Sequence, residues 1–374
     1  MAVQGVKREI SVPDTHSRVE AAIKAFAKGE IVVVTDDDDR ENEGDLFVAA
    51  SHCTPDKMAF IIRNTSGIVC APLGAELARH LHLEPMVAAN EAPLGTAFTV
   101  SVDVRHGLTT GISAEERCNT VRALANDNSG ATDFVRPGHV FPLVAREGGV
   151  LMRSGHTEAC VDLCRLASLA PVGVLAELMN DNGSVMRGPE VAAFAQKHKL
   201  VQVSIADLIA YRQSRDKLVE RVGAFPLASE IGTLQGYAYV TPFDRVHHMA
   251  FVYGDIGDGK GVLARLHRAD VIGDVFGGAK SIRASLARFK AAGRGVIVYL
   301  RDGTAGVPVA EIPHESDTET DAARSRQWRE IGLGAQILKD LGISSIRLLT
   351  STKRTYVGLG GFGIEIVSTE MLES

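Results

Sequence analysis

The chain contains 374 residues, a length that favours two domains, each large enough to bury its own core. Hydrophobic residues make up 45% and charged residues 23% of the composition, and the formal net charge is −6. This balance is typical of a globular protein and argues against a surface that binds nucleic acid or an anionic membrane.

Targeting signals and cysteine usage point to the cytoplasm. No apolar run approaches the ~20 residues of a membrane-spanning helix. The basic residues Lys7 and Arg8 are not followed by the apolar segment of a secretory signal. All five cysteines lie at or before Cys164, and their spacing is not that of a metal site. An odd number of cysteines favours reduced, buried thiols, so we expect a cytoplasmic protein that binds neither membranes nor nucleic acid.

The first predicted elements surround a strongly acidic segment. A helix is predicted over residues 18–26, and Gly29 ends it. Two short apolar runs at residues 31–35 and 46–50 are rich in β-branched residues, which indicates buried strands. Between them, residues 36–45 form an acidic loop in which seven of ten side chains are carboxylates. Because core strands hold both ends, we interpret this segment as an ordered loop.

The acidic loop has two interpretations. Packing like charges so closely raises the free energy unless cations neutralise them, and hard oxygen ligands suit Mg²⁺ or Mn²⁺. The alternative is a solvated turn, which is what most acidic runs are, and composition alone does not separate the two. A calcium loop of the EF-hand type fits less well, because Asn42 occupies the position that needs glycine.

Residues 54–125 continue the alternation of helices and strands. A helix begins at the Thr54-Pro55 cap, and a second helix begins at a capping box over residues 113–116 and continues towards residue 125. The other predicted elements are strands at residues 67–71 and 96–102 and a loop at residues 84–96.

Residues 136–158 contain two segments whose side chains suit a binding site. Residues 136–143 hold too much proline and glycine for a helix, and we expect His139 to lie in a rigid turn. Residues 149–158 are predicted to lead from a strand through a tight turn into a helix, whose N-terminus forms an anion site with free backbone N–H groups. The side chains at that N-terminus are Arg153, His156 and Thr157.

Glu177 lies among apolar neighbours on a strand predicted at residues 172–179. Partial desolvation there suits an acid–base role, and the alternative is a buried glutamate paired with an arginine.

The charged, glycine-free residues 212–221 are interpreted as a connector, which divides the chain into domains at residues 1–213 and 214–374. The remaining predicted elements are helices at residues 190–198, from 205, and at 332–341, and strands at residues 200–203, 236–240, 249–253 and 296–300.

Five motifs of the first half occur in a fixed order and resemble those of 3,4-dihydroxy-2-butanone-4-phosphate synthase, a lyase of riboflavin biosynthesis. They are residues 36–45, Ser66-Gly67-Ile68-Val69-Cys70, Thr109-Thr110-Gly111, Arg136-Pro137-Gly138-His139 and Arg153-Ser154-Gly155-His156-Thr157-Glu158. The resemblance covers about residues 10–212. It implies an α+β fold with a mixed sheet flanked by helices, two Mg²⁺ (or Mn²⁺) ions per site, and a homodimer. The implied reaction converts D-ribulose 5-phosphate into formate and L-3,4-dihydroxybutan-2-one 4-phosphate.

The same resemblance assigns roles to individual residues. Glu41 and His156 match metal ligands, and a bound divalent metal would stabilise the enediol that forms when a proton next to the ketone is removed. His139 and Glu177 match catalytic positions, and Asp36 and Glu43 are further candidates for proton transfer. The matching substrate-binding positions are Arg40, Glu41, Asp45, Thr110, Arg153, Ser154, Gly155, His156, Thr157 and Glu177.

Residues 230–370 resemble GTP cyclohydrolase II, an α+β domain often fused behind the synthase. That reaction needs a zinc ion held by three cysteines, and the matching positions hold Asp270, Ser281 and Arg283. Serine is a poor zinc ligand, arginine repels the metal, and no cysteine follows Cys164. Further reactive positions hold Gln327 and Thr355, so we expect no zinc in the second domain and a structural or regulatory role.

Three hypotheses follow for the whole chain. The leading one is a Mg²⁺-dependent synthase that acts on D-ribulose 5-phosphate and carries a catalytically inactive second domain. The alternative is a bifunctional enzyme that retains GTP cyclohydrolase II activity through another metal site. The third is a binding or scaffold protein without a reaction of its own, against which the intact acidic loop and the residues His139, His156 and Glu177 argue.

Overall fold

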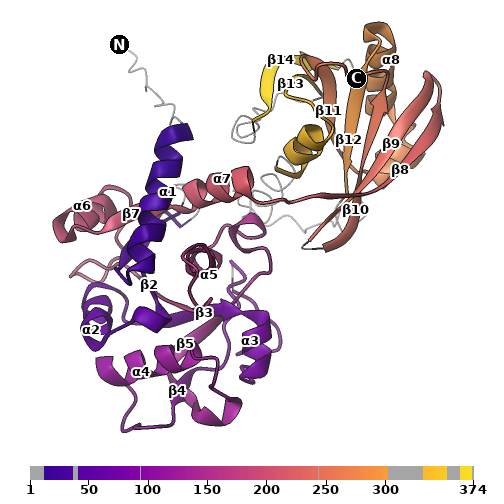
Figure 1. Ribbon diagram of the computed structural model, residues 1–374. Helices are drawn as coiled ribbons and strands as arrows, with labels where there is room; N and C mark the ends of the chain where they lie inside the picture. The colour runs from indigo at the N-terminus through magenta and orange to yellow at the C-terminus, as the bar shows by residue number, and fades with distance from the viewer. Residues whose placement is uncertain are drawn as a thin grey trace. The chain divides into compact units, whose positions relative to one another are not determined.

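The structure is a computed structural model that describes residues 12–36, 41–92, 94–242, 244–301, 332–351 and 363–372. The chain divides into two compact units, Met1–Tyr211 and Arg212–Ser374, which are described separately (Figure 1). Each unit combines a mixed β-sheet with helices, so the predicted α+β class with two domains is confirmed. Among the described helices, none is long and apolar enough to cross a membrane.

A seven-stranded mixed sheet forms the centre of the first unit, in the order β4-β5-β3-β6-β2-β1-β7. Strand β1 runs antiparallel to β2 and parallel to β7, while β3 runs parallel to β5 and antiparallel to β6. The strands are β1 (Val32–Thr35), β2 (Gly44–Ala49), β3 (Cys70–Gly74), β4 (Val102–Val104), β5 (Phe134–Ala145), β6 (Gly173–Glu177) and β7 (Val201–Ser204).

Helices cover both faces of this sheet. They are α1 (Val12–Ala27), α2 (Pro55–Asn64), α3 (Ala75–His80), α4 (Ala114–Leu124), α5 (His156–Leu166), α6 (Pro189–His198) and α7 (Ile205–Arg215), with 3₁₀ turns at Ala50–His52, Ala131–Asp133 and Gly149–Leu151. The predicted caps are confirmed, because Thr54 accepts a hydrogen bond from the backbone of Lys57 and Ser113 forms a complete capping box with Glu116.

The alternation of β2 decides which side chains reach which face. Leu46 and Val48 belong to the hydrophobic core shared with α2, α4 and α6. The residues between them point to the opposite face, where the ring of Phe47 makes an edge contact with His156 at the start of α5. Asp45 lies on the same face as Phe47, so a carboxylate is carried towards the N-terminus of α5.

Strand β5 corrects the expectation that His139 lies in a turn. On β4, Val102 pairs with Val140 and the next residue, Asp103, pairs with Val135, so residues 136–139 form a bulge within a continuous strand. A β-carbon on Gly138 would lie 2.1 Å from the carbonyl carbon of Val102. The bulge therefore needs glycine and tolerates proline, which explains why the composition suggests a turn.

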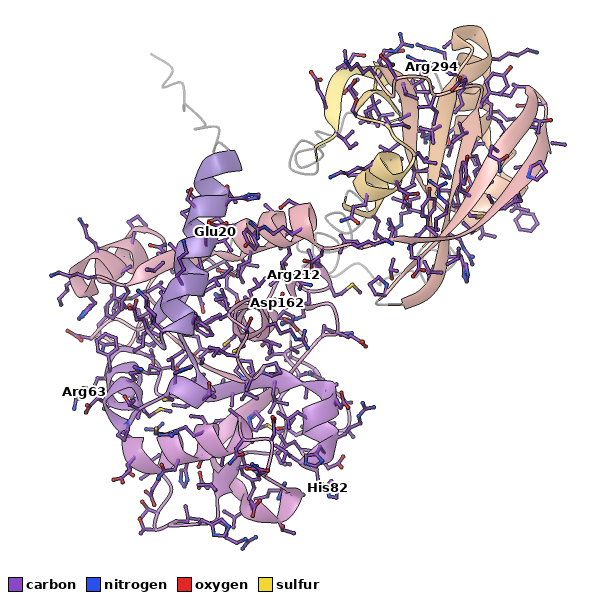
Figure 2. All side chains as sticks on the ribbon, in the orientation of Figure 1. Glu20, Arg63, His82, Asp162, Arg212 and Arg294 are labelled. Carbon is purple, nitrogen blue, oxygen red and sulfur yellow. The ribbon has the colours of Figure 1, made fainter. Side chains whose placement is uncertain are left out.

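Other local expectations were partly wrong. The strand predicted at residues 67–71 begins only at Cys70, and that predicted at residues 96–102 is reduced to isolated bridges at Phe98 and Thr99 before β4. The apolar residues 149–151 form a 3₁₀ turn and not a strand. Buried Asp162 of α5, which is labelled in Figure 2, accepts a hydrogen bond from the backbone of Val150 (2.8 Å) and so holds this turn against the helix.

The second unit contains another seven-stranded mixed sheet, in the order β14-β13-β11-β12-β10-β9-β8. Its core brings together Leu263, Phe289 and Ile297, from two strands and a helix. Its elements are β8 (Glu220–Ser229), β9 (Gly232–Thr241), β10 (Asp244–Tyr253), β11 (Val262–Arg268), a π-helical turn (Ile272–Phe276), α8 (Lys280–Ala292), β12 (Gly295–Leu300), a helix over residues 332–340, β13 (Ser345–Thr350) and β14 (Glu365–Met371).

We predict that Gly173→Ala destabilises the first unit, because an added β-carbon would lie 2.2 Å from the buried Cys160 Sγ. Overpacking of this kind costs about 1–3 kcal/mol. Urea unfolding followed by circular dichroism would measure the loss. Gly130→Ala is the control, since its nearest neighbour would be 4.0 Å away. The double variant Gly173→Ala, Cys160→Ala should recover part of the loss, and equal stability of all variants would contradict the prediction.

Candidate active site

The candidate site lies where the acidic loop, β2, β6 and α5 meet. The antiparallel register of β2 and β6 places Asp45 directly opposite Glu177. His156 is the first residue of α5 and is buried above the same face of the sheet. A cavity of about 150 Å³ opens here, and it is lined by Glu41, Glu43, Asp45, Cys70, Thr96, Phe98, Leu143, Arg153, His156, Thr157, Leu175 and Glu177.

Three side chains at the edge of the cavity have the geometry of a metal site. One ligand atom each from Asp36, Glu41 and His156 lies within 4.8 Å of the others, and we call these residues the metal-ligand cluster. Asp36 also organises the loop, because its two carboxylate oxygens accept hydrogen bonds from the backbone N–H groups of Glu41 (3.0 Å) and Glu43 (2.9 Å). The chain thus turns back on Asp36, which brings Glu41 to His156.

Two buried atoms next to the cluster indicate that a cation fits there. His156 Nε2 and Asp45 Oδ1 are 3.9 Å apart, and neither has a hydrogen-bond partner among the described residues. The other ring nitrogen, Nδ1, lies 3.5 Å from Glu41 Oε2. Carboxylate oxygens dominate this donor set, and such oxygens are the preferred ligands of Mg²⁺ and Mn²⁺.

The electrostatics of the site reflect its excess of carboxylates. Burial raises the pKa of Asp45 to about 7, and Glu177, Glu41 and Glu43 add to the rise while His156 opposes it. Burial lowers the pKa of His156, but Asp45, Glu41 and Asp36 outweigh this effect and raise the pKa to about 9. Without a metal, protons therefore provide the positive charge that these carboxylates need.

The N-terminus of α5 forms the opposite wall of the cavity. Its N-cap residue is Gly155, and no side chain caps the helix. Arg153 lies just before it, with Nη1 2.6 Å from Glu158 Oε2 and Nη2 donating to the carbonyl of Leu94 (3.0 Å). A β-carbon on Gly155 would lie 2.2 Å from Arg153 Nη1, so glycine is required for the guanidinium to sit across the helix end. The arrangement suits an anion.

Glu177 and Glu43 approach the cavity from other directions. Glu177 accepts a 2.7 Å hydrogen bond from Ser66 and is only partly buried, so the alternative of a buried Glu–Arg pair does not apply. Glu43 lies 3.6 Å from Arg187, and burial followed by Glu41 and Glu177 raises its pKa. Ser154 is half-buried beside Gly155, whereas Arg40 lies outside the described residues.

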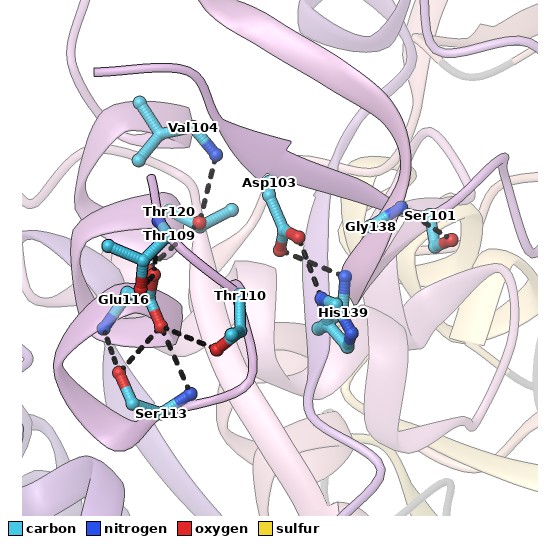
Figure 3. Close-up of polar contacts among 10 residues, drawn as sticks. All are labelled: Ser101, Asp103, Val104, Thr109, Thr110, Ser113, Glu116, Thr120, Gly138 and His139. Carbon is cyan, nitrogen blue, oxygen red and sulfur yellow. Dashed lines mark hydrogen bonds and ion pairs between the residues drawn. The ribbon is translucent and has the colours of Figure 1, made fainter. Parts of the chain in front are cut away.

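His139 and Thr110 form a separate cluster (Figure 3). His139 Nδ1 lies 2.7 Å from Asp103 Oδ2, and the hydroxyl of Thr110 donates to Glu116 (3.4 Å). Neither His139 nor Thr110 lines the cavity. Leu143, on the same strand as His139, does line the cavity. Because the four residues from 139 to 143 span about 13 Å of extended chain, His139 lies well away from the cavity. The structure therefore brings together most of the predicted site residues but not these two.

Several residues at the site escaped the analysis of the sequence. Asp103 received no role there, and Glu116 appeared only as part of a capping box. The carboxylate of Glu116 in fact accepts hydrogen bonds from Thr109, Thr110 and Ser113. Thr96 and Phe98 line the cavity although they seemed to belong to an ordinary strand. The one signal in the sequence that could have drawn attention to this cluster is the acidic residue Asp103, which directly follows the alternating apolar residues 96–102.

In the second unit, two of the positions that match the zinc ligands contact other residues. The Asp270 carboxylate accepts a hydrogen bond from Gly273 N (3.0 Å), and the exposed Arg283 lies 3.9 Å from Glu230. Within the described residues, the metal-ligand cluster of the first unit is the only such group. Gln327 and Thr355 lie outside the described residues.

Comparisons with known proteins give the family of both units. Residues 20–211 match the family model of 3,4-dihydroxy-2-butanone 4-phosphate synthase, and residues 220–371 match that of GTP cyclohydrolase II. The chain is 46% identical over 371 residues to the bifunctional riboflavin biosynthesis protein RIBA 1, chloroplastic, of Arabidopsis thaliana, covering 94% of this chain and 68% of that protein.

Two solved structures are also similar. One is RibBX of A. baumannii, described as a two-domain 3,4-dihydroxy-2-butanone 4-phosphate synthase, with a TM-score of 0.77, 34% identity, and coverage of 96% of this chain and 99% of that one. The other is a 3,4-dihydroxy-2-butanone 4-phosphate synthase in complex with two magnesium ions, with a TM-score of 0.52, 46% identity, and coverage of 53% and 97%. The chain therefore belongs to the 3,4-dihydroxy-2-butanone 4-phosphate synthase family of riboflavin biosynthesis, in the form that carries a second, GTP cyclohydrolase II-like domain.

Proposed function

We propose that the domain of residues 1–213 converts D-ribulose 5-phosphate into formate and L-3,4-dihydroxybutan-2-one 4-phosphate with two divalent ions, Mg²⁺ or Mn²⁺, and that the domain of residues 214–374 does not hydrolyse GTP. The observation that carries the first part is the metal-ligand cluster beside the two unpartnered buried atoms of Asp45 and His156. A relative of the first domain is described with two magnesium ions, which agrees with this assignment.

Each group at the cavity has a task that fits its position. Glu41 and His156 would hold the metal, which when bound stabilises the negative charge that develops on the sugar oxygens. Asp45, whose carboxylate is buried in the cavity floor, suits a substrate hydroxyl. Glu177 and Glu43 reach the cavity from different elements and can accept and return protons there. Asp36 supports them by holding the loop and takes part in the cluster.

The N-terminus of α5 is the natural place for the phosphate of the substrate. Arg153 supplies a fixed positive charge, and the uncapped helix end supplies backbone N–H donors from Gly155 onwards. Ser154 and Thr157 add hydroxyl groups beside them. The phosphate would then lie on one wall of the cavity and the reacting carbon atoms near the metal-ligand cluster on the other.

The positions of His139 and Thr110 support a homodimer formed through the first domain. Both residues match functional positions of the family but lie outside the cavity of their own chain. Two exposed apolar residues, Ile68 and Ile112, lie close to the cluster of His139 and Thr110. Ile112 follows Gly111, which packs on Asp103 and His139. Ile68 follows Gly67, whose carbonyl accepts a hydrogen bond from Arg117. We propose that this surface meets a second copy of the chain, so that each cavity receives His139 and Thr110 from the partner subunit.

The chemistry of the former zinc positions supports an inactive second domain. Asp270 is held by a backbone N–H, Ser281 is a weak ligand, and Arg283 is cationic and near Glu230. The alternative is a bifunctional enzyme, which the match of residues 220–371 to GTP cyclohydrolase II favours. We place the synthase activity of the chain in the cytoplasm, although the plant relative named above carries a chloroplastic name.

We predict that Glu41→Gln and His156→Ala each abolish formate release from D-ribulose 5-phosphate, because both remove a metal ligand. Calorimetric titration with Mg²⁺ should show binding to the unchanged protein and loss of it in both variants. EDTA should stop the reaction, and Mg²⁺ or Mn²⁺ should restore it. Glu76→Gln, an exposed carboxylate in α3, is the matched control. Normal turnover by either ligand variant would contradict the metal assignment.

We predict that two inactive variants restore activity when they share a dimer. A heterodimer of one His139→Ala chain and one Glu41→Gln chain contains one site with both groups intact, so it should show about half of the activity of the unchanged dimer. Both homodimers should be inactive. The two chains can be co-expressed with different affinity tags and purified in sequence. An inactive heterodimer would show that His139 and Glu41 of the same chain act together.

We predict that the unmodified protein contains no stoichiometric zinc and releases no formate from GTP. Elemental analysis and a coupled formate assay measure both quantities on one sample. Replacing Asp270, Ser281 and Arg283 by cysteine should create zinc binding, since thiolates are strong ligands. Turnover of GTP should still be absent, because the groups that act with the metal work as a unit. Zinc at one equivalent together with GTP hydrolysis by the unmodified chain would establish the bifunctional alternative.

A further inference from the structure

Asp103 is a buried carboxylate to which none of the roles above is assigned. Its side chain is only 4% exposed, and it lies on β4 beside the bulge of β5. His139 contacts it through two groups at once. The backbone N–H of His139 donates to Oδ1 (2.9 Å), and the ring nitrogen Nδ1 lies 2.7 Å from Oδ2 (Figure 3).

We propose that Asp103 is a positioning residue that sets both the orientation and the tautomer of His139. A carboxylate can only accept hydrogen bonds, so the ring must donate from Nδ1. The neutral ring then carries its lone pair on Nε2, which is the nitrogen left to accept and return a proton. This inference rests on the proposed function, in which His139 takes part in the reaction.

The two hydrogen bonds make the arrangement specific. Because the backbone N–H of His139 occupies Oδ1, only Oδ2 remains opposite the ring. Gly111 closes over the pair, since a β-carbon there would lie 2.2 Å from Asp103 Oδ2 and 2.7 Å from His139 Nδ1. The loop that carries Thr110 therefore packs on the hydrogen bond itself and restricts the ring to one position.

The surroundings also keep the charge of Asp103 compensated. Burial lowers the pKa of the neighbouring Arg117, and the negative charge of Asp103 counteracts part of this lowering. The pair of His106 and Asp133 shows what a His–Asp contact at the surface looks like. That pair is also a His–Asp contact, but it is 3.3 Å long and its side chains are 78% and 34% exposed, as expected of a surface pair. The His139 ring is 40% exposed and anchored on one edge only, which leaves Nε2 accessible.

The experiment compares the imidazole tautomer and the kinetics of the full-length protein with those of Asp103→Asn. Asparagine offers one acceptor and one donor group. The backbone N–H of His139 requires the acceptor, so the amide N–H₂ of the new residue faces Nδ1 and forces the proton to Nε2. Long-range ¹H–¹⁵N correlation spectra report the tautomer of each histidine, and comparison with His139→Asn assigns the signal of His139.

We expect the unchanged protein to have the proton of neutral His139 on Nδ1 and the Asp103→Asn variant to have it on Nε2. The variant should lose about 100-fold or more in kcat with little change in KM, because proton transfer and not substrate binding is affected. Ser101→Ala is the matched control. It removes the acceptor for the backbone N–H of Gly138 in the same bulge, and it should keep the Nδ1-protonated ring.

Three results would overturn the inference. One is a neutral His139 protonated on Nε2 in the unchanged protein, which is decisive even if the variant fails to fold. The second is an unaltered tautomer in Asp103→Asn. The third is a switched tautomer with unaltered kcat. Failure of the proposed function would look different, because the unchanged protein would then release no formate while its tautomer could still be read.

Discussion

The pairing of β2 with β6 is the constraint on which the candidate site depends. It sets Asp45 opposite Glu177 on one face of the sheet, and the buried His156 of α5 lies over the same face. A shift of the register by one residue would turn Asp45 into the hydrophobic core and bring Leu46 to the cavity. The rest of the site adapts to this pairing. The backbone N–H groups of Glu41 and Glu43 donate to Asp36, which places Glu41 near the histidine, and Arg153 approaches from the helix end.

The sequence predicted the local features of this arrangement well. Caps at Thr54 and Ser113 and the strands that flank the acidic loop follow from residue types at short spacing, whereas the grouping of Glu41 with His156 came from the resemblance to a known family. What it could not predict depends on pairing between distant segments. The bulge at residues 136–139 exists only in relation to β4, and composition alone suggested a turn. Asp103 is significant only through its contact with His139, which lies 36 positions away in the sequence.

The second unit shows how little a fold requires of the residues outside its core. The second unit keeps a complete seven-stranded sheet with a packed core, for which Leu263, Phe289 and Ile297 are sufficient. Asp270, at a position that matches a zinc ligand of the resembled family, accepts a hydrogen bond from the backbone of Gly273. Hydrophobic packing places few demands on residues outside the core, so such positions can change while stability is maintained. At the candidate site of the first unit, Asp45 Oδ1 and His156 Nε2 are buried without a hydrogen-bond partner among the described residues, and such atoms cost stability unless a ligand satisfies them.

The bulge in β5 allows residues 136–139 to change independently of the paired residues that form the hydrophobic core. The pairs Val102–Val140 and Asp103–Val135 hold the sheet on either side of it, so the residues between them, with the exception of Gly138, can change without altering the alternation of core residues. Any such change moves His139 directly. Natural variation around His139 would therefore shift the reach of this side chain while the hydrophobic core remains the same. Laboratory libraries that keep Gly138 and vary its neighbours in this short insertion would sample different positions of the His139 ring.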